Sequence, residues 1–61
     1  MMIQLTDENG NKFYLNADFI ERITTRQYQG GSAIELTTGR WIECIESADE
    51  VAKKIHEATS G

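Results

Sequence analysis

The chain has 61 residues with ten acidic and six basic side chains, a formal net charge of −4 and a pI of about 4.7. A chain this short forms one domain, residues 1–61, and buries only about 60% of the surface that its unfolded form exposes. Domains of this size are usually stabilised by disulfides, a metal or oligomerisation. The single cysteine excludes an intramolecular disulfide, and one cysteine with one histidine cannot supply the four ligands of a structural zinc site. We therefore expect a homo-oligomer.

The first predicted element is a β-hairpin. Asp-Glu-Asn-Gly at residues 7–10 lies between two runs in which apolar and polar side chains alternate. Asn-Gly between such runs is typical of a hairpin, because its turn needs positive φ angles that these residues tolerate. The predicted strands are residues 2–6 and 12–15. Asn16, Ala17 and Asp18 then interrupt the pattern as a turn.

The third predicted strand is residues 19–26. The adjacent apolar residues Phe19 and Ile20 indicate a bulge or a helical turn at its start, and a helix over residues 18–23 is the alternative. The pair Thr24-Thr25 favours a strand. Gly30-Gly31 marks a second hairpin loop.

The last predicted elements are two strands and a helix. The strands are residues 33–38 and 40–45, and both faces of the second carry apolar groups, as expected if one face meets another subunit. Ser47 and Glu50 form a capping box for a helix over residues 48–58. The predicted fold is α+β, mostly β: a small curved antiparallel sheet of about five strands with one C-terminal helix.

No set of residues indicates catalysis. The carboxylate pairs at residues 7–8 and 49–50 are explained by a turn and a helix cap. His56 has no partner at ligand spacing, and Cys44 has no basic neighbour that would lower its pKa. We expect no enzymatic activity, no metal and no cofactor.

Aromatic residues are the first candidate interaction site. One short helix cannot bury aromatic side chains on both faces of a five-stranded sheet, and Trp and Tyr are enriched at the centres of interfaces. We expect a subunit or partner interface at Tyr14, Phe19, Tyr28 and Trp41.

Arginines are the second candidate site. Arg22, Arg26 and Arg40 are scattered among glutamates rather than gathered in a basic stripe, which argues against duplex nucleic-acid binding by the monomer. The alternative function that these arginines suggest is that of an oligomeric binding module encoded by a phage or mobile element. It would hold a small anionic ligand, such as a nucleotide, between subunits, with these arginines gripping phosphate and Tyr28 and Trp41 stacking on a base.

The chain shows no sign of a membrane or export segment. Its apolar runs are far shorter than the ~20 residues of a membrane span. The N-terminus lacks the basic and apolar regions of a signal peptide. With a free cysteine, these features predict a cytoplasmic protein.

Nearly the whole chain resembles one bacterial family. The motifs are Ile3-Gln4-Leu5-Thr6, Asn9-Gly10, the run FYLNADFIERI at residues 13–23, Ile34 with Leu36, Gly39, and ESADEV at residues 46–51 followed by Ile55. They are similar to those of the small FlbD-type proteins associated with flagella and swarming motility. The resemblance implies a non-enzymatic accessory protein that contacts a flagellar-system protein and needs no cofactor.

Overall fold

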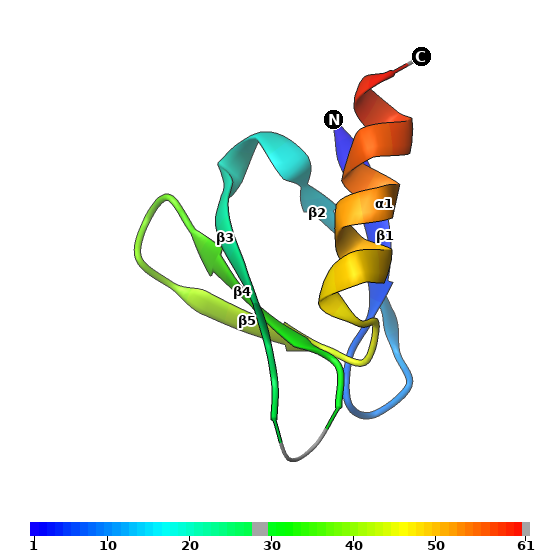
Figure 1. Cartoon of the computed structure of the whole chain (residues 1–61), viewed down its shortest axis with the longest axis vertical. Helices are drawn as coiled ribbons and strands as arrows, with labels where there is room; N and C mark the ends of the chain where they lie inside the picture. Colours follow the sequence, from blue (N-terminus) through cyan, green and yellow to red (C-terminus); the bar gives the residue numbers. More distant parts are fainter. Residues whose placement is uncertain (28–29, 61) are drawn as a thin grey trace.

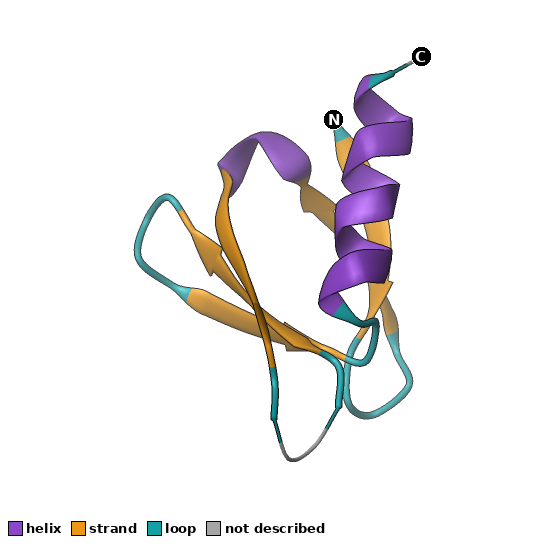
Figure 2. Cartoon of the chain, viewed as in Figure 1, coloured by secondary structure: helices purple, strands orange, loops and turns teal. Residues whose placement is uncertain are grey.

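The computed structural model describes residues 1–27 and 30–60. The elements in chain order are β1 (Met2–Thr6), β2 (Lys12–Asn16), the 3₁₀ helix η1 (Ala17–Phe19), β3 (Ile20–Thr25), β4 (Ser32–Leu36), β5 (Trp41–Cys44) and α1 (Ala48–Thr59). The strands form two antiparallel sheets, β1-β2 and β3-β4-β5, and α1 runs alongside β1 (Figure 1). Most regular structure outside α1 is strand (Figure 2). The predicted class is confirmed: mostly β and antiparallel, with one C-terminal helix.

The first hairpin forms around Asp7. Its carboxylate accepts the backbone N–H groups of Asn9 and Asn11, each at 2.9 Å, and Gly10 takes the positive φ of 84° that closes the turn. The pairing sets Leu5 opposite Phe13, so their side chains share the face that packs on the core. The turn therefore sets the register that directs this face inward.

A 3₁₀ turn forms the corner between the sheets. The Asn16 side chain caps it by accepting the Asp18 N–H at 3.0 Å, and β3 begins at Ile20 rather than at Phe19. The pairing of β3 with β4 shifts register between Ile20 and Arg22. Both irregularities lie at the adjacent apolar residues Phe19 and Ile20, where the sequence predicts a bulge or a helical turn. With the turn, Ile20 packs on the core and Phe19 stays exposed.

The three-stranded sheet presents an apolar inner face. Ile23, Ile34 and Ile42 lie directly opposite one another across β3, β4 and β5. Ile34, on the central strand, is fully buried, whereas Ile23 and Ile42, on the two edge strands, are half-buried. β5 ends at Cys44, before the end of the predicted strand, because the chain turns there toward the helix.

A backbone hydrogen bond joins the two sheets. The Ile45 N–H, just after β5, donates to the Thr6 carbonyl at the end of β1 (2.9 Å). The five strands are thus divided between two sheets joined at this seam, whereas the sequence predicts one curved sheet of about five strands. The core lies between the sheets and α1, and its buried apolar residues are Ile3, Leu5, Ile34, Cys44 and Val51.

Helix α1 begins at the expected cap residue and turns one apolar face to the core. The Ser47 hydroxyl accepts the Glu50 N–H at 3.1 Å. Val51 is buried, and Ile55 and Ala58 pack against the core at helical spacing, whereas Ala52 is exposed. The helix packs against β1 and β3, and so covers both sheets with one face.

Gly31 provides a test of the packing at the start of β4. A Cβ atom there would lie 2.2 Å from the Cys44 carbonyl oxygen, whereas a Cβ at Gly30 would meet nothing within 4 Å, although both φ angles are positive. We predict that Gly30→Ala lowers the free energy of unfolding by about 1 kcal/mol through its φ angle. Gly31→Ala should lower it by about 2 kcal/mol more, because backbone must move. Urea unfolding measures both, and equal losses would contradict the close approach.

Candidate functional site

The aromatic candidates lie on three separate parts of the surface. Tyr14 on β2, Phe19 in η1 and Trp41 on β5 are 66%, 54% and 52% exposed, respectively. Tyr14 lies on the outer face of the two-stranded sheet, opposite Gln4, whose amide donates to its hydroxyl at 3.4 Å. Trp41 lies on the outer face of the other sheet. Because the inner faces of both sheets pack on one core, these residues do not form a single patch. Tyr28 lies outside the described residues.

Trp41 belongs to a row that crosses the three-stranded sheet. Arg22 on β3 is opposite Glu35 on β4, and Glu35 is opposite Trp41 on β5, so the three side chains share the outer face. Arg22 Nε lies 3.8 Å from Glu35 Oε1. This pair is largely exposed on the arginine side, so its contribution to stability is small.

Arg26 bridges the two sheets. Its guanidinium donates from Nη1 to Glu8, in the turn of the first hairpin, and its Nη2 lies 2.9 Å from Glu43 Oε2 on β5. The side chain is only 14% exposed. The hydrogen bond to Glu8, helped by the charges of Glu43 and Glu8, raises the pKa of Arg26 although burial opposes this. Arg26 thus holds the hairpin turn against β5.

The arginine candidates are therefore not grouped for an anionic ligand. Arg22 faces Glu35, and Arg26 is held by two carboxylates. Arg40 is exposed in the turn that leads into β5. The alternative of a small anionic ligand held by these three arginines is not supported, because binding would first have to separate two of them from glutamates.

Sequence reasoning missed a polar cluster at the seam between the sheets. Glu46 Oε1 accepts the Thr6 N–H at 2.9 Å, beside the bond from Ile45 to the Thr6 carbonyl. Ser32 Oγ donates to the Glu46 carbonyl at 3.0 Å and lies 3.2 Å from Cys44 Sγ. Glu46 and Thr6 are 40 positions apart, and no local pattern signals such a pair.

The charge of Glu46 is stabilised by this geometry. Partial burial would raise its pKa, but the backbone N–H groups of Thr6 and of Glu46 itself, with the charge of Lys54, bring it below the ordinary value. The ionised form is therefore the one that the folded chain favours.

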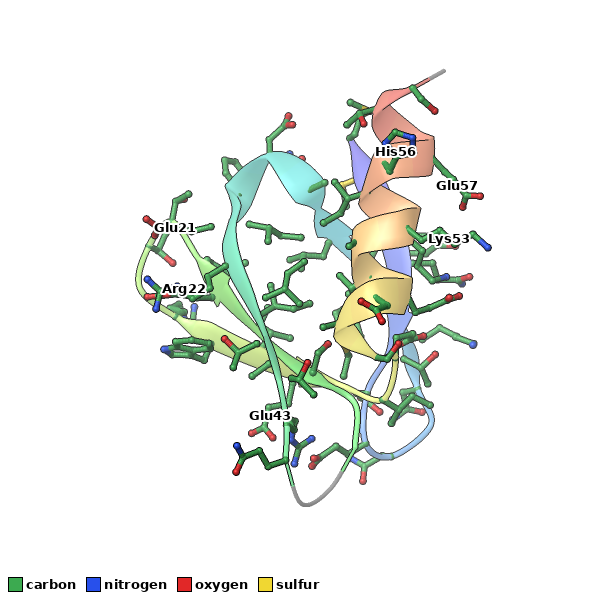
Figure 3. The ribbon with its side chains drawn as sticks, in the orientation of Figure 1. Glu21, Arg22, Glu43, Lys53, His56 and Glu57 are labelled. Carbon is green, nitrogen blue, oxygen red and sulfur yellow. The ribbon has the colours of Figure 1, made fainter. Side chains whose placement is uncertain are left out.

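The ionisable side chains of the sheet and of the helix do not gather in one place. Figure 3 shows Arg22 and Glu43 on the three-stranded sheet, and Lys53, His56 and Glu57 on the helix, away from both. Residues 1–27 and 30–60 contain no group of three His, Cys, Asp or Glu side chains placed to hold a metal ion, and they form no pocket. Within the same ranges, no helix has the length and apolar character needed to cross a membrane.

Glu46 predicts a component of acid sensitivity. Because its folded pKa is lowered, its contribution to stability is complete above the unfolded pKa of about 4.5 and is lost as pH falls through the lower folded value. We predict that Glu46→Gln lowers the free energy of unfolding by about 1 kcal/mol at pH 7 and flattens its decline below pH 5. Denaturant unfolding at several pH values measures this, with Glu57→Gln as the exposed control. Identical declines in the wild type and Glu46→Gln would contradict it.

The arginine pairs predict the outcome of a ligand screen. We expect no nucleotide in a thermal-shift panel to raise the melting temperature, because Arg22 and Arg26 are engaged by carboxylates. Arg26→Ala should lower the melting temperature and so show that the assay senses this region. A dose-dependent rise with any nucleotide would contradict the prediction.

Comparison with known proteins identifies the family. The family model described as "FlbD: Flagellar and Swarming motility proteins" matches residues 2–60. No curated protein and no solved structure matches the chain. The match includes all five described strands, the seam and α1, and it agrees with the resemblance seen in the motifs. The chain therefore belongs to the FlbD family of flagellar and swarming motility proteins.

Proposed function

We propose that this chain is a non-enzymatic accessory protein of the flagellar system that acts as a homo-oligomer through protein contacts. The family match supports the connection to motility. The observation that carries the mode of action is the exposure of three aromatic side chains, Tyr14, Phe19 and Trp41, around a small core. Aromatic residues contribute most of the binding energy at many protein interfaces.

The separation of the aromatic residues supports more than one contact. Tyr14 and Trp41 lie on the outer faces of different sheets, so one flat partner surface does not cover both. An oligomer that uses one face for a second copy would leave the other face for a flagellar protein. The proposal places the protein in the cytoplasm, where a free thiol such as Cys44 stays reduced.

A genetic experiment tests the motility role. Deletion of the gene should impair swimming or swarming, and the wild-type chain supplied in trans should restore it. We predict that Trp41→Ala and Tyr14→Ala restore motility less well, because each removes an exposed contact residue without opening the core. Lys53→Ala is the control, since this side chain lies on the exposed face of the helix.

Two outcomes would contradict the proposal. A deletion strain with unaltered swimming and swarming would rule out the motility role. Full restoration by Trp41→Ala and Tyr14→Ala together, at protein levels equal to the wild type, would rule out contacts through these aromatic residues.

A further inference from the structure

β5 is one of the two edge strands of its sheet, and its outer edge has unpaired backbone groups. The Leu36 N–H donates to the Arg40 carbonyl, so alternation along β5 directs the backbone of Ile42 and Cys44 toward β4. Trp41 and Glu43 therefore direct their N–H and C=O groups away from β4. The bond from the Ile45 N–H to Thr6, on that same outer side, agrees with this alternation. Within residues 1–27 and 30–60, the backbone groups of Trp41 and Glu43 have no other strand to pair with.

The other strand edges carry features that block strand addition. β3 has a register shift between Ile20 and Arg22, and α1 packs against it. β2 begins with Lys12, and β1 is engaged at its end by Ile45 and packed by α1. Bulges, lysines and covering elements are the usual protections of an edge. β5 has a regular register with β4 and contains neither lysine nor proline.

We propose that β5 of one chain pairs antiparallel with β5 of a second copy across a two-fold axis, with Trp41 opposite Glu43 of the partner subunit. This inference rests on the proposed homo-oligomer and assigns its interface. The pairing would join two three-stranded sheets into one continuous sheet, which is strand addition with the same chain as partner.

The register follows from charge and hydrogen bonding. Residues whose backbone groups point away from β4 must pair with each other across the axis. The possible registers therefore differ in how Trp41 and Glu43 of the two strands are matched. Pairing Glu43 with Glu43 of the partner subunit would set two carboxylates directly opposite, which is destabilising. Pairing Trp41 with Trp41 of the partner subunit would leave Glu43 opposite the turn at Gly39. The mixed register alone satisfies the outward backbone groups of both residues.

Both faces of the joined sheet are complementary in this register. On the inner face, Ile42 meets Ile42 of the partner subunit, so the apolar row of Ile23, Ile34 and Ile42 continues across the axis. On the outer face, the indole lies beside a glutamate that Arg26 already binds, which brings the aromatic ring and the guanidinium together. The exposed surface of both Ile42, which is half-buried in one chain, and Trp41, which is exposed, is thus reduced in the dimer.

Proline substitution at the edge tests the pairing. Glu43→Pro removes the outward N–H and breaks no bond to β4, since proline is tolerated on edge strands. Glu43→Gln is the control for the lost charge, and Thr25→Pro removes an outward N–H on the opposite edge of the same sheet. Light scattering should give the wild type, Glu43→Gln and Thr25→Pro a mass of twice 6.9 kDa and Glu43→Pro a mass of 6.9 kDa, with circular dichroism showing that each is folded.

The outcomes separate this inference from the motility role. A folded Glu43→Pro variant that keeps the wild-type oligomeric mass would overturn the β5 interface and leave the oligomer in place. A monomeric wild type would overturn both the interface and the oligomer, while motility of the deletion strain tests the flagellar role independently.

Cross-linking provides a second readout that does not rely on proline. Ile42→Cys in a Cys44→Ser background should form a disulfide-linked dimer on mild oxidation, because the mixed register places the two introduced thiols opposite each other in a non-hydrogen-bonded pair. Thr24→Cys in the same background, on β3, should stay uncross-linked. Equal cross-linking of the two variants would overturn the register.

Discussion

The structure depends on the backbone of Thr6, where the two sheets meet. Its carbonyl accepts the Ile45 N–H, and its N–H donates to the Glu46 carboxylate. An isolated two-stranded hairpin is marginal in water, so β1-β2 needs the rest of the chain to hold its apolar face. The seam supplies that contact where β5 ends, and the buried Leu5 and Val51 pack behind it. The Glu46 carboxylate thus accepts a hydrogen bond from a partly buried N–H group that would otherwise have no partner.

The seam and the Arg26 bridge decide which surfaces remain available for binding. Arg26 holds the hairpin turn to β5 through Glu8 and Glu43, so the charges of these three side chains are engaged within the chain. The inner faces of both sheets are used by the core. The surfaces that remain available include the outer face of each sheet and the first part of the β5 edge. The exposed Trp41 lies where these last two meet, which is why one residue serves both the proposed function and the proposed interface.

The sequence predicts what is local and misses what joins distant segments. Alternation and the Asn9-Gly10 turn predict the first hairpin, and the Ser47 cap predicts where α1 begins, because each depends on residues a few positions apart. The adjacent Phe19 and Ile20 indicate an irregular start for β3, which the structure resolves as a 3₁₀ turn followed by a register shift. The division into two sheets and the partners of Arg26 and Glu46 depend on packing between segments many residues apart. The sequence therefore offers Arg26, with the other arginines and the aromatic residues, as a candidate ligand group, although its partners are carboxylates of the chain itself.

Membership of the FlbD family gains a physical interpretation from these contacts. Many of the motif residues serve the fold: Asn9-Gly10 closes a turn, Ile34 fills the core, and the Glu46-Ser47 pair holds the seam and caps the helix. Residues that serve the fold carry the architecture without specifying what the protein binds. Specificity must therefore come from side chains that the fold does not need. Among the residues that the structure describes, the large aromatic ones with exposed side chains are Tyr14, Phe19 and Trp41, and aromatic residues of this kind are enriched at the centres of interfaces.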